Sequence, residues 1–177
     1  MCFSESESDR RCRFRAKDLE ILEIVPSAEW DYLLTGRASG ATVNGTSNAR
    51  YAYATINTDG TSSVEGMILF PDGVTIGDSE AAWGTINGAG TNCTSAQWTA
   101  LEGKGCVFLP AACYRIGDEV YGVASGDYGN DFYYWSSSSY TLDVEKAYNV
   151  YFGQSLFSKS YNLRSYGLSV RLVRDVK

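Results

Sequence analysis

The pattern of apolar and polar positions predicts two short helices, and a capping signal introduces each of them. In the first, Ser27 precedes Trp30, Leu33 and Leu34, which recur at helical spacing, and Gly36 follows them. Ser is a favoured residue at the start of a helix and Gly at its end. We therefore expect a helix from Ser27 to Leu34 whose apolar stripe is buried.

The second helix signal is stronger, because Thr94-Ser95-Ala96-Gln97 is a capping box. The Thr94 hydroxyl can accept a hydrogen bond from the backbone of Gln97, and the Gln97 side chain can reach back to Thr94. Trp98 and Leu101 supply the apolar stripe, and Gly103 predicts the end of the helix.

Strand patterns fill most of the remaining chain, separated by Asn-Gly and Asp-Gly turn signals and by a glycine-rich loop at 79–93. Two helices in the first part and dense strands in the last part predict an α+β domain, with the two short helices packed on a twisted antiparallel sheet with long loops. The predicted strands are 51–56, 66–70, 106–109, 119–123, 132–137, 147–152 and 168–173.

Alternation assigns faces in the strand around Val150. Side chains of a strand point alternately to its two sides, so Tyr148, Val150 and Phe152 share one face. That face is the more apolar one. Asn149 and Tyr151 are therefore expected to point outward.

The same argument applies to the last predicted strand. Leu168, Val170 and Leu172 are expected to point inward, and Ser169 and Arg171 outward.

Composition excludes several kinds of active site. The chain of 177 residues contains no His. A Ser-His-Asp triad, a Cys-His pair and an imidazole zinc site are therefore excluded. No metal site or cofactor is predicted.

Charge and hydropathy exclude further classes. The net charge is −6, and no basic stripe of the kind that binds a duplex is present, so we expect no nucleic-acid partner. No apolar run is long enough for a membrane span, and residues 1–25 lack the apolar core of a signal peptide. Residues 1–25 are predicted to be a disordered or atypical lead-in, and residues 26–177 the domain.

The cysteines are odd in number and show no C-x-x-C spacing, which argues against a metal knuckle. Cys106 and Cys113 lie in apolar surroundings, where a free cysteine behaves as a small buried hydrophobe. A Cys93–Cys106 or a Cys106–Cys113 bridge is the alternative.

The tyrosines gather near the C-terminus: ten of the thirteen lie in residues 113–177, around a serine run at 136–139. Tyr gives a large amphipathic contact at low entropic cost, and Ser gives adaptable hydrogen bonds. This composition is typical of a recognition surface.

Several segments resemble one superfamily. Residues 26–32 (Pro-Ser-Ala-Glu-Trp-Asp-Tyr) and 167–174 (Gly-Leu-Ser-Val-Arg-Leu-Val-Arg) resemble the helix signature and closing strand of formylglycine-generating-enzyme-like (sulfatase-modifying-factor) domains. Residues 107–115, 134–137, 147–152 and 164–167 resemble a Bacteroidales-type group related to the Fibrobacter major paralogous domain. The resemblance covers residues 26–177 and implies a C-type-lectin-like fold.

Many members of that group resemble the variable proteins of diversity-generating retroelements, in which substitutions vary a ligand-binding face on a constant scaffold. The resemblance implies a non-enzymatic domain that binds a protein or glycan at a bacterial or phage surface. The matching positions lie between the constant motif residues. The candidate ligand-binding residues are Tyr133, Ser138, Ser139, Tyr140, Asn149, Tyr151, Ser155, Phe157, Ser158, Ser160, Tyr161 and Asn162.

Two activities of related domains are not carried over. The three prolines follow Val, Phe and Leu, so the Glu-Pro-Asn-like triplet of calcium-dependent sugar binding is absent, and Asn130-Asp131 matches a second calcium motif only faintly. The paired cysteines of the oxidase members have no counterpart after Cys113. A structural or adhesive surface domain is the alternative. An enzyme is a third: an oxidase-like enzyme, or a glycan-processing enzyme with paired carboxylates, for which Asp118-Glu119 or Asp143 and Glu145 are available.

Overall fold

The computed structural model describes residues 23–58, 60, 62–122, 131–153 and 156–173. The fold is α+β: most elements are strands, and two short α-helices accompany them. None of the helices in the described ranges is long and apolar enough to cross a membrane.

A four-stranded sheet forms the centre of the fold, in the order β7-β4-β5-β8. Its strands are β4 (Tyr51–Asn57), β5 (Ser63–Leu69), β7 (Thr91–Thr94) and β8 (Val107–Pro110). β4 pairs with β5 antiparallel and with β7 parallel. The predicted strands at 51–56, 66–70 and 106–109 correspond to β4, β5 and β8.

β4 separates two cores, because both of its faces are buried. Ala52 and Ala54 face a first core together with Ile68, while Tyr51 and Tyr53 face a second core. β4 therefore presents small side chains to the first core and large aromatic rings to the second.

The first core lies between the four-stranded sheet, α2 (Ser95–Gly103) and a small sheet of β2 (Ala41–Val43), β3 (Thr46–Ala49) and β6 (Thr75–Ile76). A short 3-10 helix, η2 (Asp78–Glu80), precedes α2. The predicted capping box is confirmed: the Gln97 amide donates to Thr94 Oγ1 at 3.2 Å, and the Thr94 amide donates to Gln97 Oε1 at 2.9 Å. Leu101 is buried in this core, and Trp98 packs on Phe108.

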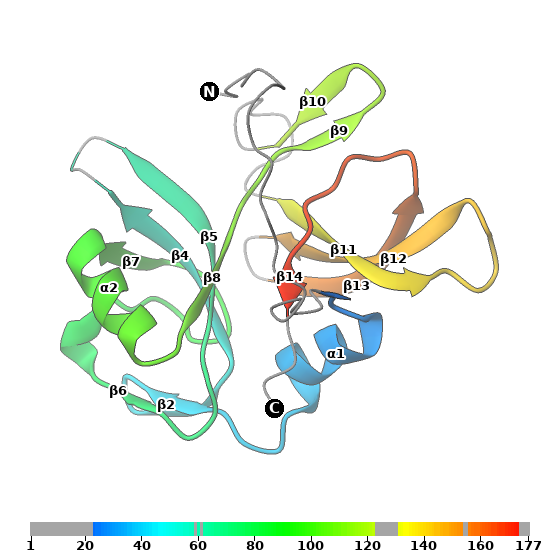
Figure 1. Ribbon diagram of the computed structural model, residues 1–177. Helices are drawn as coiled ribbons and strands as arrows, with labels where there is room; N and C mark the ends of the chain where they lie inside the picture. Colours follow the sequence, from blue (N-terminus) through cyan, green and yellow to red (C-terminus); the bar gives the residue numbers. More distant parts are fainter. Residues whose placement is uncertain (1–22, 59, 61, 123–130, 154–155, 174–177) are drawn as a thin grey trace, which may run out of the picture.

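The second core lies between the four-stranded sheet and a three-stranded sheet, β11 (Phe132–Ser139), β12 (Lys146–Gly153) and β13 (Leu156–Leu163), in that order. Phe132 and Phe152 stack across this sheet with ring centroids 4.9 Å apart. Trp30 packs on Tyr134 and Phe152 at 6.3 Å. Figure 1 shows the two sheets side by side, with α2 on the outer side of the first and α1 below the second.

The first helix differs from its prediction. α1 covers Ser27–Asp31, and a π-helical turn, η1 (Tyr32–Gly36), continues it. Ser27 is the first helical residue, and Pro26 takes the capping position without a side-chain hydrogen bond. The predicted buried stripe holds for Trp30 and Leu34.

A buried arginine joins the end of η1 to the four-stranded sheet. The Arg37 guanidinium donates to the carbonyls of Leu33, Phe70 and Arg50 at 3.0, 2.8 and 3.3 Å, and forms an ion pair with Asp72 at 2.9 Å. Its side chain is only 6% exposed. These bonds connect the helical segment to Arg50, which precedes β4, and to Phe70, which follows β5.

The predicted sheet is corrected. It is not a single antiparallel sheet, because the described strands form five sheets and two of their pairings, β4–β7 and β2–β6, are parallel. A tight hairpin cannot join parallel partners, and several elements lie between β4 and β7 and between β2 and β6 along the chain. Within the predicted lead-in, β1 (Glu23–Ile24) pairs with β14 (Leu172–Val173), and Val25 is buried in the second core. Residues 1–22 of the predicted lead-in lie outside the described residues.

The last predicted strand is also corrected. Leu168 is buried, but Val170 and Leu172 are exposed. Before β14, this segment makes only isolated bridges, Gly167 to Arg115 and Ser169 to Tyr134. Residues 168–171 therefore do not form a continuous strand in a sheet, and alternation cannot assign their side chains to a buried and an exposed face.

The prediction of buried free cysteines is confirmed for Cys106 and wrong for Cys113. Cys93 and Cys106 are free thiols buried in the first core, so no bridge joins Cys106 to Cys93 or to Cys113. Cys113 is free and exposed, contrary to the prediction of burial. It precedes the hairpin of β9 (Tyr114–Ile116) and β10 (Glu119–Tyr121), which projects from the body of the fold (Figure 1).

Candidate functional site

The three-stranded sheet carries most of the residues that the sequence predicted to bind ligand, and its register divides them between two faces. Val150 pairs with Tyr134 and Lys159, and Asn149 pairs with Trp135 and Ser160. We call the face of Val150, which packs on the second core and α1, the inner face, and the face of Asn149 the outer face. The predicted residues of the outer face are Tyr133, Ser139, Asn149, Tyr151, Ser158, Ser160 and Asn162, and those of the inner face are Ser138, Tyr140, Phe157 and Tyr161. Ser155 lies outside the described residues.

Tyrosines on the outer face pack on one another. Tyr133 contacts Tyr151 at 5.1 Å and Tyr114 at 5.0 Å between ring centroids, and Tyr114 stacks on Tyr121 at 5.6 Å. Tyr114 and Tyr121 belong to the β9–β10 hairpin, which therefore covers this part of the outer face. Tyr133 and Tyr151 are half-buried as a result.

Burial changes the chemistry of these phenols. It raises the pKa of Tyr133 to about 12, and the neighbouring Tyr114 and Tyr151 add to the effect. Burial and a hydrogen bond with Asp131 raise the pKa of Tyr151 to about 12. Both phenols are therefore neutral over the physiological range, and each can donate one hydrogen bond.

Asn149 corrects the sequence prediction most sharply. It lies on the face opposite to Val150, as alternation predicts, but it is 0% exposed. Neither its amide nitrogen nor its amide oxygen has a hydrogen-bond partner. Alternation gave the correct side of the strand, but the neighbours that cover that side decide exposure.

Ser138 and Phe157 are engaged in contacts within the protein. Ser138 Oγ accepts a hydrogen bond from the backbone N–H of Ser27 at 3.0 Å. It thereby satisfies a donor at the start of α1 that the helix itself leaves open. Phe157 packs edge-on against Tyr51 at 6.2 Å, at the border of the second core. We do not expect either residue to contact a ligand.

At the far end of the sheet, the inner face extends beyond α1 and carries three tyrosines. The rings of Tyr140 and Tyr161 stack with centroids 4.0 Å apart, and Tyr148 meets Tyr140 edge-on at 5.3 Å. Two ammonium groups lie over the rings: Lys146 is 5.4 Å from the centroid of Tyr161, and Lys159 is 5.6 Å from that of Tyr148. We call Tyr140, Tyr148 and Tyr161 the tyrosine cluster.

Each lysine also has an acidic partner. Lys146 Nζ lies 3.0 Å from Asp143 Oδ2, and Lys159 Nζ lies 2.6 Å from Asp31 Oδ2. The hydrogen bond between Lys146 and Asp143 raises the pKa of the lysine and lowers that of the carboxyl. The charges beside the cluster therefore compensate one another and hold the lysines over the rings.

Exposed aliphatic residues lie beside the cluster. Leu142 and Val144, in the turn between β11 and β12, are 83% and 87% exposed, and Leu163 is 37% exposed. Arg164 brings the end of β13 to this turn, because its Nε donates to the Val144 carbonyl at 3.0 Å. The turn extends to the edge of the molecule (Figure 1). We call the tyrosine cluster together with Leu142, Val144 and Leu163 the hairpin tip.

Sequence reasoning missed most of the hairpin tip. Tyr148 was assigned to the constant scaffold, and Leu142, Val144 and Leu163 are not among the candidate ligand-binding residues. β13 itself was not predicted, because polar residues occur on both of its faces and hide the period of two. The available signal was the pair of aliphatic residues in the otherwise polar turn after Tyr140.

The carboxylates considered for catalysis are engaged at hairpins. Asp118 lies 3.6 Å from Arg115, Glu119 accepts a hydrogen bond from the Tyr121 hydroxyl, and Asp143 pairs with Lys146. Within the described ranges, no group of three or more His, Cys, Asp or Glu side chains could hold a metal ion. Asn130 of the faint calcium motif lies outside the described residues.

Comparison of the chain with protein-family models, with curated proteins and with solved structures gave no match.

Proposed function

We propose that this chain is a non-enzymatic recognition domain that binds a ligand on a cell surface through the hairpin tip. The observation that carries the proposal is the packing of Tyr140, Tyr148 and Tyr161 beside the exposed side chains of Leu142 and Val144. Exposed apolar patches with a polar rim are typical of interaction sites, and tyrosine is enriched in them.

The tip is suited to binding because its rings are held in place before a ligand arrives. Tyr140 and Tyr161 stack on each other, and the two lysines lie over the rings of the cluster. A partner therefore orders few side chains when it binds, which lowers the entropic cost of association.

The aliphatic residues favour a protein ligand over a glycan. Sugar rings stack on aromatic faces, which the tip also offers, but Leu142 and Val144 add a surface that an apolar protein side chain matches better. The resemblance to C-type-lectin-like variable proteins supports the same class of function. Among its implied positions, Tyr140 and Tyr161 belong to the tip.

A binding screen against surface proteins and a glycan array tests the proposal. We expect wild-type protein to select a protein ligand, and the Val144→Ser and Tyr161→Ser variants to lose that binding. Val120→Ser is the matched control, because Val120 is also an exposed valine, 60% exposed, and lies in the β9–β10 hairpin away from the tip. If the wild-type protein selects a glycan instead, and the two tip variants lose that binding, the hairpin tip is still the site but the ligand is a glycan.

The same screen separates the alternatives. Equal binding by wild type and both tip variants would refute the tip as the site. Binding lost only in Tyr133→Ala/Tyr151→Ala would move the site to the outer face. A structural or adhesive surface domain predicts weak attachment to many surfaces that none of these substitutions changes.

A further inference from the structure

A pocket with a volume of about 380 Å³ lies away from the hairpin tip, between the four-stranded sheet and the start of β11. This volume is at the lower end of the range of small-molecule sites. Three strands of the sheet, the loop before β7 and the segment after β8 contribute to its wall. The lining residues are Tyr53, Ala54, Thr55, Glu65, Gly66, Ala89, Gly90, Thr91, Asn92, Ala111 and Phe132.

Register places a row of polar side chains along one side of the pocket. Thr55 on β4 pairs with Asn92 on β7 and with Glu65 on β5, so the three lie side by side across the sheet. The segment after β8 continues the row, because the Ala111 amide donates to the Glu65 carbonyl at 2.7 Å. The pocket therefore has hydrogen-bonding groups from three neighbouring strands.

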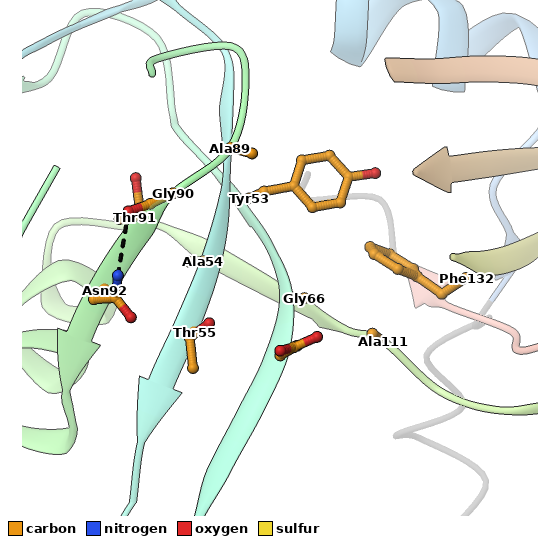
Figure 2. Close-up of a pocket in the computed structure, with 11 residues that line it drawn as sticks. Tyr53, Ala54, Thr55, Gly66, Ala89, Gly90, Thr91, Asn92, Ala111 and Phe132 are labelled. Atoms are coloured by element: carbon orange, nitrogen blue, oxygen red, sulfur yellow. Dashed lines mark hydrogen bonds between the residues drawn. The ribbon is translucent and has the colours of Figure 1, made fainter. Parts of the chain in front are cut away.

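The opposite end of the pocket is aromatic. The rings of Tyr53 and Phe132 meet edge-on with centroids 5.9 Å apart, and Figure 2 shows them together at one end, with Thr55 and Asn92 at the other. An apolar wall with a few polar groups at one side is the usual construction of a small-molecule site.

Close backbone packing shapes the remaining wall. A side chain at Gly84 would place its Cβ 2.3 Å from the Ala89 carbonyl oxygen, and Gly90 has a φ of 96°. These two glycines let the loop before β7 fold onto itself, so that only Ala89 and Gly90 line the pocket. The glycine-rich segment, which has no phosphate-binding pattern, thus has a role in forming this site.

Glu65 is the single charged residue among those that line the pocket. Its Oε2 atom is buried and has no hydrogen-bond partner. No basic side chain of the described residues is paired with it. A buried carboxylate oxygen without a partner is costly, so a ligand that brings a positive charge and N–H donors would compensate it.

We propose that this pocket binds a small organic cation, an ammonium or guanidinium group on a short apolar stem. Glu65 supplies the counter-charge, and Thr55 and Asn92 accept further hydrogen bonds. The ring of Tyr53 packs on the apolar stem or attracts the cation, since the face of an aromatic ring attracts a nearby positive charge. The cation can come from a free small molecule or from a Lys or Arg side chain of a protein.

NMR titration of the full chain with butylguanidinium and with butylammonium tests the proposal, with pentanamide as the neutral control and pentanoate as the anionic control. We expect the two cations to shift the backbone signals of Thr55, Glu65 and Asn92, and the controls to leave them unchanged. Glu65→Gln keeps the shape of the side chain and is expected to weaken cation binding about tenfold or more.

Three further variants make the result decisive. Glu102→Gln removes an exposed carboxylate in α2 and is expected to leave binding unchanged. Ala111→Val narrows the pocket without changing its charge and is expected to weaken binding. It covers the case in which Glu65→Gln does not fold. Tyr161→Ser is expected to bind the cations normally, so failure of the pocket and failure of the tip can be told apart.

A capped Gly-Gly-Lys-Gly-Gly peptide and its norleucine counterpart distinguish the two sources. Tighter binding of the lysine peptide than of butylammonium indicates a protein side chain, and the reverse indicates a free small molecule. The proposal is overturned if cations and pentanamide bind alike, if Glu65→Gln binds cations as well as wild type does, or if neither cation nor lysine peptide binds at its solubility limit.

Discussion

The rings of Tyr140 and Tyr161 lie nearly parallel, with centroids 4.0 Å apart and an interplanar angle of 19°. Tyr140 directly follows β11 and Tyr161 lies in β13, and β12 lies between these two strands in the sheet. Tyr148 of β12 pairs directly with Tyr161, and its ring meets Tyr140 edge-on. One aromatic surface thus spans all three strands of the sheet.

A double-mutant cycle measures this contact. Tyr140→Ser and Tyr161→Ser are each expected to lower the free energy of unfolding by about 1 kcal/mol or less, because the rings lie at the edge of the fold. The coupling between them is expected to be about 0.5 to 1.5 kcal/mol. Urea denaturation measures both values. The control is a cycle of Tyr140 with Tyr32, an exposed tyrosine in η1, whose effects should be additive. If the coupling between Tyr140 and Tyr161 is as small as in this control, the stack is absent in solution.

Asn149→Leu is expected to stabilise the protein by about 1 to 2 kcal/mol. Leu has a similar size, and the substitution removes two buried polar atoms that have no hydrogen-bond partner. Asn162→Leu, on the same face but half-buried, is the control and should change the free energy of unfolding by less than about 0.5 kcal/mol. If Asn149→Leu destabilises the protein instead, the amide has a partner in solution.

Arg37→Met is expected to lower the free energy of unfolding by about 3 to 5 kcal/mol. The substitution removes the donor for three carbonyls and leaves Asp72 without its ion-pair partner. Arg115→Met is the control, because Arg115 is largely exposed and its ion pair with Asp118 is long; we expect a change below about 1 kcal/mol. Equal losses in both variants would contradict the structural role of Arg37.

Alkylation with iodoacetamide should separate the cysteines by pH. Burial raises the pKa of Cys93 and of Cys106 to about 11, so at pH 9 only about one in a hundred of these thiols is ionised. Of the three cysteines that lie in the described ranges, Cys113 is exposed and is expected to react first, as measured by mass spectrometry of peptides after a short exposure. Alkylation of all three at similar rates would show that the first core opens readily.

The raised pKa of these two thiols also makes the free energy of unfolding depend on pH in the alkaline range. A thiol whose pKa is raised in the folded state stabilises the fold fully below its unfolded pKa, near 9.0. That stability is lost as pH rises towards about 11, because the unfolded chain then ionises first. Cys93→Ala should show a smaller decline than wild type between these two pH values, as followed by urea denaturation.

Glu65→Gln is expected to raise the free energy of unfolding by about 1 kcal/mol, since it removes a charge whose buried oxygen has no hydrogen-bond partner. Urea denaturation in the absence of any cation measures the change. The control is Glu102→Gln, which should be neutral. A loss of stability on Glu65→Gln would mean that the fold itself uses the carboxylate.

Several local features of this protein follow from its sequence alone. The capping box at Thr94 and Gln97, the buried ring of Trp30 and the two sides of β12 all follow from residue type and spacing, because they depend on neighbours within a few positions. The concentration of tyrosine after residue 113 favours a recognition surface there, which stays a prediction.

Which of those residues are accessible depends on tertiary packing. A period of two assigns a side chain to a face, but the elements that cover the face come from distant parts of the chain: the β9–β10 hairpin packs on Tyr133, and α1 meets Ser138. The pocket around Glu65 likewise forms only because strand pairing places Thr55, Glu65 and Asn92 side by side. Exposure and cavities depend on long-range packing, which local periodicity does not encode.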